Sequence, residues 1–326
     1  MTSSQYRHLP TFFQKTGNKI SPFLMLFLFS IALTNCGSFL PGPNGPPPQG
    51  KNSTSANTLP AFSHIFTIVL ENKEYQTLIG NSSSSYFSSL ARTYALATQY
   101  YAISHPSLPN YLALTSGNTF GLNSDCTTCF QSVSNIADQI EASGRTWKAY
   151  MESMPSPCYI GNSPNGLYAQ KHNPFLYYDD IRTNSSRCTS HIVPFTQFAT
   201  DLSSNQLPNY VWLTPNMCDD THDCPLADGD AWLSQVVPSI LKSPAFTQGG
   251  VLFITFDEGK TDNGCCNDAA GGQVATLIIS PFVKKDWQSS TQATHYSLLR
   301  TIEDAWKLPP LGDARNSTAM TEYFTH

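Results

Sequence analysis

The stretch His64–Asn72, HIFTIVLEN, decides the fold of this 326-residue chain. It is a run of mostly apolar residues, and Val251–Phe256 (VLFITF) has the same form. Short continuous apolar runs are typical of buried strands, and ligands of α/β sheets bind beyond the carboxyl ends of such strands. Each run leads directly into a pair of oxygen-bearing side chains, which are Glu71 and Asn72, then Asp257 and Glu258. Acidic residues also follow strands simply because the chain returns to water, but two such pairs predict a hard-cation site.

Helical and strand-like segments alternate around these two runs. The apolar periodicity predicts strands at 64–70, 147–151, 209–213, 251–256 and 274–280, and helices at 86–96, 134–143, 230–242 and 295–307. Strands separated by helices predict a mainly parallel sheet that is covered on both faces. The pattern stops between about 155 and 205, and we interpret this stretch as a loop-rich insertion that shapes the substrate entrance.

The first 36 residues have the composition of an export signal. Three basic residues and no acid precede Phe23–Leu33, an apolar stretch that is too short to span a bilayer, which needs about 20 residues. The following Leu33–Cys36 (LTNC) resembles a bacterial lipobox, although Asn35 occupies a position that normally takes a smaller residue. We therefore expect an exported protein at the cell surface or in the periplasm, lipid-anchored through Cys36; the alternative is an ordinary cleaved signal.

Residues 37–60 are rich in Pro, Gly, Ser and Asn and contain little to bury. This composition predicts a tether, followed by a folded domain at 61–326. The formal net charge of the chain is −5, and no basic run occurs anywhere. Nucleic acid is therefore not an expected partner, and we expect contact with a membrane only through the lipid anchor.

Eight cysteines remain when Cys36 is assigned to the anchor, and an even number in an exported chain indicates disulfides. We expect three pairs, 126–129, 158–188 and 218–224. The adjacent Cys265 and Cys266 either pair with each other or bond separately. A zinc ribbon is disfavoured because no second CxxC accompanies Cys126–Cys129.

The most distinctive segment is His105–Tyr111, HPSLPNY. Two prolines within seven residues predict a rigid loop here. Ser107 lies between them, and a serine hydroxyl is a weak nucleophile until a base or a metal activates it. The alternative is a proline-rich turn in which Ser107 and Asn110 cap their own backbone.

Two histidines are further candidates for catalysis. His222 lies in an acidic loop that a 218–224 disulfide would close, and His295 begins the last predicted helix after Thr294. A histidine at a helix N-terminus tends to stay neutral because the helix dipole disfavours its charge. Each could instead be an ordinary surface residue.

In this order, the segments resemble the bacterial acid phosphatase/phospholipase C phosphoesterase family of the alkaline-phosphatase-like superfamily. The matching residues span essentially the whole mature domain: 69–75, 105–117, 215–216 with 222–223, 255–259 and 295–304. The stretch HPSLPNYLALTSG at 105–117 is specific and favours the acid phosphatase branch. The resemblance implies a three-layer α/β/α sandwich with a mainly parallel central sheet.

The resemblance also implies roles for single residues. A divalent metal cation would be held by Glu71, Asn72, Asp257 and Glu258, and completed by Ser107 as nucleophile. Substrate binding would fall to His105 and Asn110. His222 and His295 would lie near the leaving group or the phosphate and assist catalysis.

The predicted function is thus metal-dependent hydrolysis of phosphate monoesters through a phosphoserine intermediate on Ser107, acting on a small phosphorylated substrate. Two alternatives remain, a phospholipase C-type phosphodiesterase and a non-catalytic surface-binding lipoprotein. Oxygen ligands favour Mg, Ca or Mn, whereas nearby histidines leave Zn and Fe open.

Overall fold

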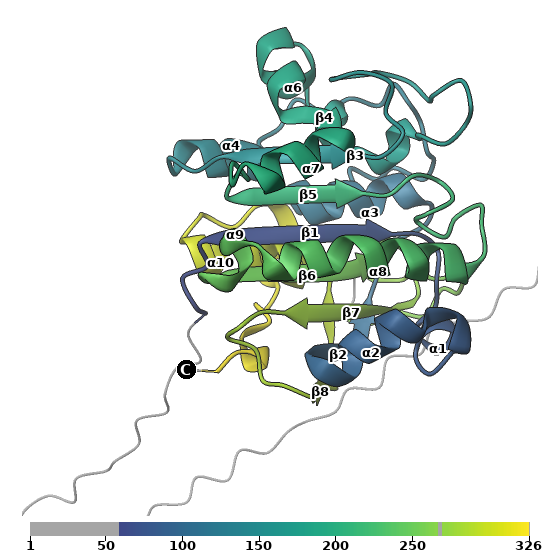
Figure 1. Cartoon of the computed structure of the whole chain (residues 1–326). Helices are drawn as coiled ribbons and strands as arrows, with labels where there is room; N and C mark the ends of the chain where they lie inside the picture. The colour runs from purple at the N-terminus through teal and green to yellow at the C-terminus, as the bar shows by residue number, and fades with distance from the viewer. Residues whose placement is uncertain (1–58, 267–268, 326) are drawn as a thin grey trace, which may run out of the picture. The chain divides into compact units, whose positions relative to one another are not determined.

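One nine-stranded sheet organises the described part of the chain, which comprises residues 59–266 and 269–325 of a computed structural model. Figure 1 shows the strands in the order β4-β3-β5-β1-β6-β7-β2-β8. The ninth strand, β9, pairs with β2. The bounds are β1 His64–Leu70, β2 Ala95–Tyr101, β3 Trp147–Met151, β4 Ile192–Pro194, β5 Tyr210–Thr214, β6 Gly250–Phe256, β7 Gln273–Ile279, β8 Trp287–Ser289 and β9 Ala293–Thr294. The five predicted strands are all present, with ends that shift by one residue at most.

The sheet is mainly parallel, as predicted. The strands β4, β3, β5, β1 and β6 pair in parallel, whereas β7 is antiparallel to both β6 and β2. The edge where β1, β5 and β6 finish is called the C-terminal edge below, and the edge where they begin is called the N-terminal edge. Both β5 and β6 are buried along their whole length, which explains their continuous apolar sequences.

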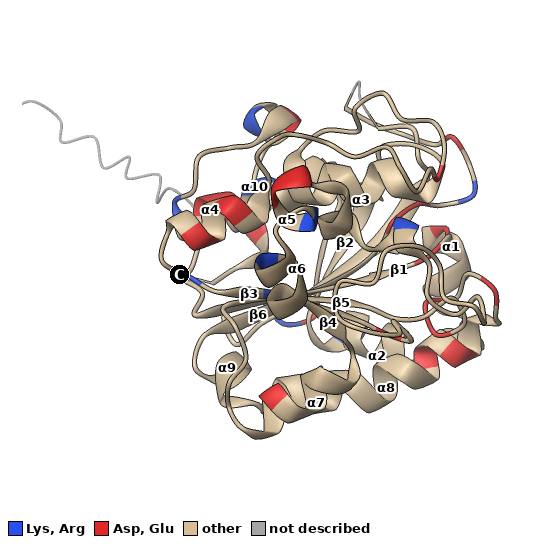
Figure 2. Cartoon of the chain, turned by 90° about the horizontal axis from the view of Figure 1, so that it is seen from above, with Lys and Arg blue, Asp and Glu red and all other residues tan. Residues whose placement is uncertain are grey.

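Helices cover both faces of the sheet, and the end-on view in Figure 2 shows the three layers. One face carries α2 (Ser85–Thr93), α7 (Thr196–Ser203), α8 (Leu226–Lys242) and α9 (Pro244–Thr247). The other carries α3 (Ser107–Ser116), α4 (Ile136–Ala142) and α10 (His295–Trp306). The shorter elements are α1 Tyr75–Leu78, η1 Ser82–Ser84, η2 Gln170–His172, η3 Pro174–Tyr177, α5 Asp179–Arg182, α6 Ser185–His191, η4 Gly312–Asn316 and η5 Thr321–Tyr323. The predicted α/β/α sandwich is therefore confirmed.

The prediction that 105–111 is a loop was wrong, because α3 begins at Ser107. Pro106 is the N-cap and Pro109 lies in the first turn, where backbone N–H groups have no partner within the helix. Proline is tolerated at such positions. Gly117 ends the helix in the left-handed conformation, with φ 71°.

The prediction of a helix at 86–96 ran too far. The helix α2 ends at Thr93, and Ala95–Tyr101 forms the strand β2, which the sequence analysis missed. The sequence ALATQYY has neither a continuous apolar run nor strict alternation, so it lacks the pattern of a strand. Its pairing with β7 outweighs this weak local preference.

The stretch 155–205 contains several short helices, and its strand β4 extends the sheet beyond β3. The predicted export signal, Cys36 and nearly all of the tether 37–60 lie outside the described residues. Within the described part, no helix is both long and apolar enough to cross a membrane.

Four disulfides join the eight described cysteines. The three predicted pairs, 126–129, 158–188 and 218–224, are confirmed. Of the two alternatives for the remaining cysteines, the structure contains the bond between the neighbours Cys265 and Cys266. Disulfides in this number are consistent with an exported protein.

Candidate active site

The register between β1 and β6 brings the two strand-end pairs together. Leu70 pairs with Phe256, so Glu71 and Asp257 leave the C-terminal edge beside each other. The backbone N–H of Asn72 donates to Asp257 Oδ1 (3.1 Å), and Asn72 Nδ2 donates to Glu71 Oε2 (3.1 Å). Asn72 has a φ of 52°, a conformation that asparagine adopts more readily than most residues. This turn directs both carboxylates to one point.

Ser107 lies at the same point, at the N-terminus of α3. Its hydroxyl donates to Glu71 Oε2 (3.0 Å), and its Oγ lies 3.4 Å from Glu258 Oε1. The side chain is buried, and the positive end of the helix dipole is directed at it. Ser107 therefore connects acids from the ends of β1 and β6.

His105 contacts Glu258. Its Nδ1 pairs with Glu258 Oε2, and its Nε2 donates to the carbonyl of Thr261 (3.1 Å). Burial lowers the pKa of His105, but the Thr261 carbonyl and the Glu258 charge outweigh burial and raise the pKa overall. Both ring nitrogens are thus engaged, and the geometry makes His105 a residue that orients Glu258.

Asn110 faces the backbone rather than open space. Its Oδ1 accepts from the N–H groups of Ile103 (2.9 Å) and Ser104 (3.0 Å), and its Nδ2 donates to the carbonyls of Ser104 (2.7 Å) and Pro106 (3.2 Å). The side chain is fully buried. These contacts fix the segment that leads into Ser107, which differs from the expected contact with phosphoryl oxygens.

His295 lies behind the strand end. Its Nε2–H donates to the carbonyl of Asp257 (2.6 Å), so its Nδ1 accepts from the hydroxyl of Tyr100 (3.1 Å). Burial lowers the pKa of His295 to about 4, which keeps the ring neutral as predicted, although burial rather than the helix dipole is the cause. His295 therefore fixes the backbone of Asp257 through this hydrogen bond to its carbonyl.

His222 lies on the open side of the site and is partly exposed. Its Nδ1 pairs with Asp223 Oδ1 (2.7 Å), and its Nε2 lies 3.4 Å from Lys171 Nζ. Lys171 in turn donates to Asp125 Oδ2 (3.0 Å). Burial lowers the pKa of Lys171, but the charges of Glu71 and Asp125 outweigh burial and raise it, so this cation stays charged beside His222.

Three further buried residues, to which the sequence analysis gave no role, complete the site: Tyr111, His172 and Asp220. His172 Nε2 lies 3.1 Å from Glu71 Oε1, and its Nδ1 lies 3.2 Å from Asp220 Oδ2. The Tyr111 hydroxyl donates to Glu71 Oε1, and its ring stacks on His172 at 5.3 Å. Burial lowers the pKa of His172 to about 3, so its ring is neutral between the two acids.

The site has the donors of a divalent-cation site. Asp257 Oδ2 is buried and has no hydrogen-bond partner, and the contacts of His172 Nε2 with Glu71 and of Asp220 Oδ2 with His172 lack hydrogen-bond geometry. Ligand atoms of Glu71, His172 and Asp220 lie within 4.8 Å of one another. Unpaired buried polar atoms are costly, and a cation among them removes that cost. The residues present therefore fit a bound divalent metal.

The carboxyl groups require this positive charge if they are to ionise together. Burial, and then the charges of Asp257 and Asp220, raise the pKa of Glu71 well above its ordinary value. Burial raises the pKa of Asp220 and that of Glu258 to about 7. Several acids in one dry volume repel one another unless a cation is present.

The sequence contained only weak signals for these additional residues. His172 lies in the stretch 155–205, which has no periodic pattern, and Tyr111 resembles an ordinary core aromatic. Asp220 was visible within the acidic loop, but nothing distinguished it from its neighbour Asp219. Only the folded chain shows that the insertion brings His172 to the end of β1.

Comparison with known proteins places the chain in a family. The model of the phosphoesterase family matches residues 81–309. A phosphatidylinositol-3-phosphatase of Mycobacterium tuberculosis is 33% identical over 271 residues, which are 82% of this chain and 85% of that protein. A phosphate-repressible acid phosphatase of Penicillium chrysogenum is 34% identical over 261 residues, 77% of this chain but only 61% of its own length.

Solved structures agree on the fold. A protein of the alkaline phosphatase superfamily from Vibrio parahaemolyticus aligns with a TM-score of 0.53, over 77% of this chain and 68% of its own, at 12% identity. At this identity the likeness concerns the fold alone. The family match spans Ser107, His222 and Asp257, and the resemblance noted in the sequence is confirmed. The chain belongs to the phosphoesterase family.

Proposed function

We propose that this protein hydrolyses phosphate monoesters through a phosphoserine intermediate on Ser107. One observation carries the proposal: the Ser107 hydroxyl lies at a helix N-terminus, within 3.4 Å of Glu71 and Glu258, and the neighbouring Asp257 has a buried Oδ2 without a hydrogen-bond partner. The acid phosphatase and phosphatidylinositol-3-phosphatase activities in the relatives' names support a monoester over a diester substrate.

The residues suggest a sequence of two displacements. In the first, Ser107 Oγ forms a bond to phosphorus as the bond to the alcohol oxygen breaks, and the hydroxyl proton passes toward Glu71 Oε2. The alcohol takes up a proton, for which the partly exposed His222 is the proposed donor. In the second, a water oxygen forms a bond to phosphorus as the bond to Ser107 Oγ breaks. One proton of the water passes to His222, the proton on Glu71 returns to Ser107 Oγ, and phosphate is released.

Glu71, Asn72, Asp257 and Glu258 are the proposed ligands of a divalent metal, together with Ser107, and His172 and Asp220 adjoin them. When bound, the cation would make the serine hydroxyl more acidic and offset charge on the phosphoryl oxygens. Lys171 faces the same side as His222 and would bind the phosphoryl group. His105, Asn110 and His295 are proposed to position Glu258, the segment before Ser107 and Asp257.

Replacement of the nucleophile tests the proposal. In the purified protein, Ser107→Ala should lower kcat for p-nitrophenyl phosphate by about 10³-fold or more. Ser104→Ala is a matched control, because this hydroxyl donates only to the carbonyl of His105 (3.2 Å). Acid quenching of the wild type should trap phosphate on Ser107. Wild-type turnover by Ser107→Ala would refute the mechanism.

We further propose that the protein is exported and lipid-anchored through Cys36. The LTNC sequence at 33–36 and the disulfides support this. Wild-type protein expressed in a bacterium should enter the detergent phase on phase separation. If Cys36→Ser distributes in the same way as the wild type, the acyl anchor is excluded.

A further inference from the structure

The loop between β7 and β8, with the first residue of β8, exposes two large aromatic side chains. Of the described residues, five large apolar side chains are at least 36% exposed: Val133, Ile160, Leu167, Phe282 and Trp287. Two of them lie in the segment 281–287, PFVKKDW, which belongs to this loop except for Trp287, the first residue of β8. Lys285 and its neighbour Asp286 are exposed. The ammonium of Lys284 lies 4.7 Å from the centre of the Trp287 ring and donates to the carbonyl of Glu322 (2.7 Å), so two lysines and one aspartate give the segment a net positive charge. Phe282, Lys284, Lys285 and Trp287 are called the aromatic–lysine face below.

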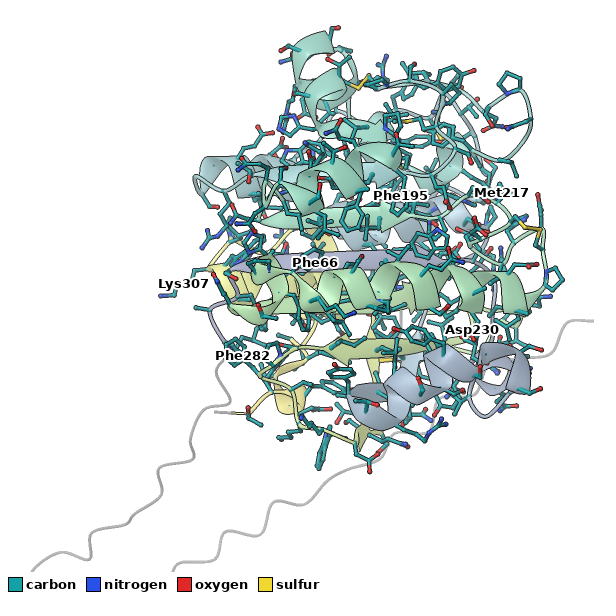
Figure 3. All side chains as sticks on the ribbon, viewed as in Figure 1. Phe66, Phe195, Met217, Asp230, Phe282 and Lys307 are labelled. Carbon is teal, nitrogen blue, oxygen red and sulfur yellow. A yellow bond between two sulfur atoms is a disulfide. The ribbon has the colours of Figure 1, made fainter. Side chains whose placement is uncertain are left out.

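This face adjoins the point where the N-terminal segment joins the domain. The described chain begins at Leu59, and the ring of Phe62 lies 6.4 Å from that of Phe282. Figure 3 labels Phe282 and Lys307 on the same edge, where β1 begins. The first residues of the described domain therefore lie beside Phe282, one member of the aromatic–lysine face.

The composition of the face suits a membrane interface. Indole and phenyl rings insert at the level of the lipid head groups, and lysine side chains lie along apolar surface with their charge in water. Near an anionic leaflet, each lysine contributes favourably to binding. A chain with a net charge of −5 and no basic run has few such places.

The C-terminal edge also exposes apolar side chains, but its charges are unsuitable. The carbonyl of Leu167 accepts from Met217 N–H (2.9 Å), and Figure 3 shows Met217 at this edge. The acids around it are well exposed, with side-chain exposures of 59% for Asp223 and 94% for Asp262. An anionic bilayer would repel this edge and attract the aromatic–lysine face.

We propose that the aromatic–lysine face docks on an anionic lipid bilayer and adds a second contact to the predicted acyl anchor. One consequence concerns the substrate, and it rests on the proposed function. The strand β1 has seven residues and separates the two edges by roughly 23 Å. Docking therefore turns Ser107 away from the lipid, and the phosphate monoester arrives from water.

Tryptophan fluorescence can test the contact directly. The chain has five tryptophans; Trp287 is 40% exposed, and the other four are at most 6% exposed. The full chain is bound to vesicles of brominated phosphatidylglycerol and phosphatidylcholine. Acylated protein is anchored through its lipid, and protein without the acyl group is mixed with an excess of vesicles. Bromine should quench the Trp287 emission, and Trp287→Phe should abolish the quenching.

Charge variants show whether lysines drive the contact. Lys285→Gln should weaken the quenching titration about fivefold, the factor that one lysine contributes near an anionic surface. Lys260→Gln is the matched control, because Lys260 is also exposed but follows the end of β6, two residues after Glu258, and its backbone N–H donates to Glu74 Oε1 (2.9 Å). Neutral vesicles and high salt should both reduce the quenching.

Four outcomes would overturn the docking proposal. The first is an absence of quenching, and the second is quenching that Trp287→Phe leaves intact. The third is binding that is lost in Leu167→Ala rather than in Trp287→Phe, since it would assign the C-terminal edge to the membrane. The fourth is a lipid-independent blue shift of the Trp287 emission that grows with protein concentration, which would indicate a second copy of the chain as the occupant.

The orientation has a separate test on vesicle-bound protein. Hydrolysis of p-nitrophenyl phosphate should equal that of the unbound protein, whereas phosphatidic acid in the same vesicles should release no detectable phosphate. Release of phosphate from the lipid at the rate of the water-soluble substrate would overturn the orientation. Failure to hydrolyse either substrate would refute the proposed function, and the Trp287 quenching would still decide the docking.

Discussion

The two edges of the sheet differ in the kind of side chain that they bury and expose. At the C-terminal edge, polar side chains from segments far apart in sequence are buried together, and Glu71, Asp257 and Asp220 are fully excluded from water. At the N-terminal edge, Phe282 and Trp287 come from one short segment, 281–287, and stay exposed. The C-terminal edge therefore buries several acids at a cost in desolvation, whereas the N-terminal edge leaves apolar surface in contact with water.

The helix α10 spans both edges and illustrates the contrast. His295 at its start is a buried base that burial keeps neutral, and it supports Asp257. Glu303, two turns later, is a buried acid whose Oε1 accepts from Leu311 N–H (2.8 Å). The first group has a partner at each nitrogen, whereas the second leaves Oε2 without one. We therefore expect function to depend on one end of α10 and pH-dependent stability on the other.

The largest expected effect comes from a change at the C-terminal edge. Asp257→Asn removes a charge that Asn72 orients, and it should lower kcat/KM by more than about 100-fold, because even partners outside the ligand shell commonly cost 10–100-fold. Metal content by mass spectrometry should fall in parallel. Asp262→Asn removes an acid from the same loop whose side chain is 94% exposed, and it should change neither quantity.

If Asp257→Asn retained full activity with metal bound, the C-terminal edge would not be a catalytic metal site. If Asp262→Asn were equally damaging, general loss of negative charge would explain both results. Comparison of the two variants therefore distinguishes loss of a metal ligand from loss of negative charge near the site.

The disulfides should divide stability from function. Removing the Cys158–Cys188 bond, whose cysteines are 30 residues apart, should lower the free energy of unfolding by about 4 kcal/mol, and removing Cys218–Cys224, 6 apart, by about 2 kcal/mol. The second bond closes the loop that holds Asp220 and His222, so its Ser double variant should lose more activity. Urea unfolding and kcat/KM of the folded variants measure the two quantities.

One result would contradict the expected order of the two disulfides in their effect on activity. If loss of Cys158–Cys188 reduced the activity of fully folded protein more than loss of Cys218–Cys224, the acidic loop would not need its disulfide to hold the site. The insertion that brings His172 to Glu71 would then be the more sensitive support.

The sequence predicted the buried strands of the sheet better than the polar contacts of the candidate site. The strands β1 and β6 could be predicted because a run of apolar residues buried on both faces needs no tertiary information. The strand β2 could not, since its pairing with the antiparallel β7 determines its structure. The two prolines in 105–111 predicted a loop, but both fit the start of α3, one as the N-cap and one in the first turn.

The site followed the same division. Glu71 and Asp257 could be chosen as candidates because they follow strand-like runs directly, and strand register alone brings them side by side. His172 depends on the path of a long insertion, which has no sequence periodicity. The side-chain partners of Asn110 and His295 are set by packing, so no pattern in the sequence could show that both contact backbone.

A smaller effect is expected from Glu303→Gln, measured as thermal stability against pH. Burial raises the pKa of Glu303 to about 7, so the folded state favours the protonated form. The stability that this group contributes is complete below its unfolded pKa of about 4.5 and is lost as pH rises through 7, by on the order of 2 kcal/mol between pH 5 and 7. The Gln variant should therefore show a flatter profile. An unchanged profile would mean that Oε2 has a charged or hydrogen-bonding partner in solution.

The smallest effect should come from Tyr100→Phe, behind the C-terminal edge. The tyrosine hydroxyl donates to His295 Nδ1 (3.1 Å), and this contact fixes the tautomer whose Nε2–H reaches the Asp257 carbonyl. Phenylalanine keeps the ring packing, so only a net hydrogen bond of about 1 kcal/mol is lost, which corresponds to about a fivefold fall in metal affinity. His295→Gln removes both contacts and should cost more. If Tyr100→Phe instead weakened metal binding as much as His295→Gln, the hydroxyl rather than the imidazole would be the group that supports Asp257, and the buried polar chain behind the site would extend to β2.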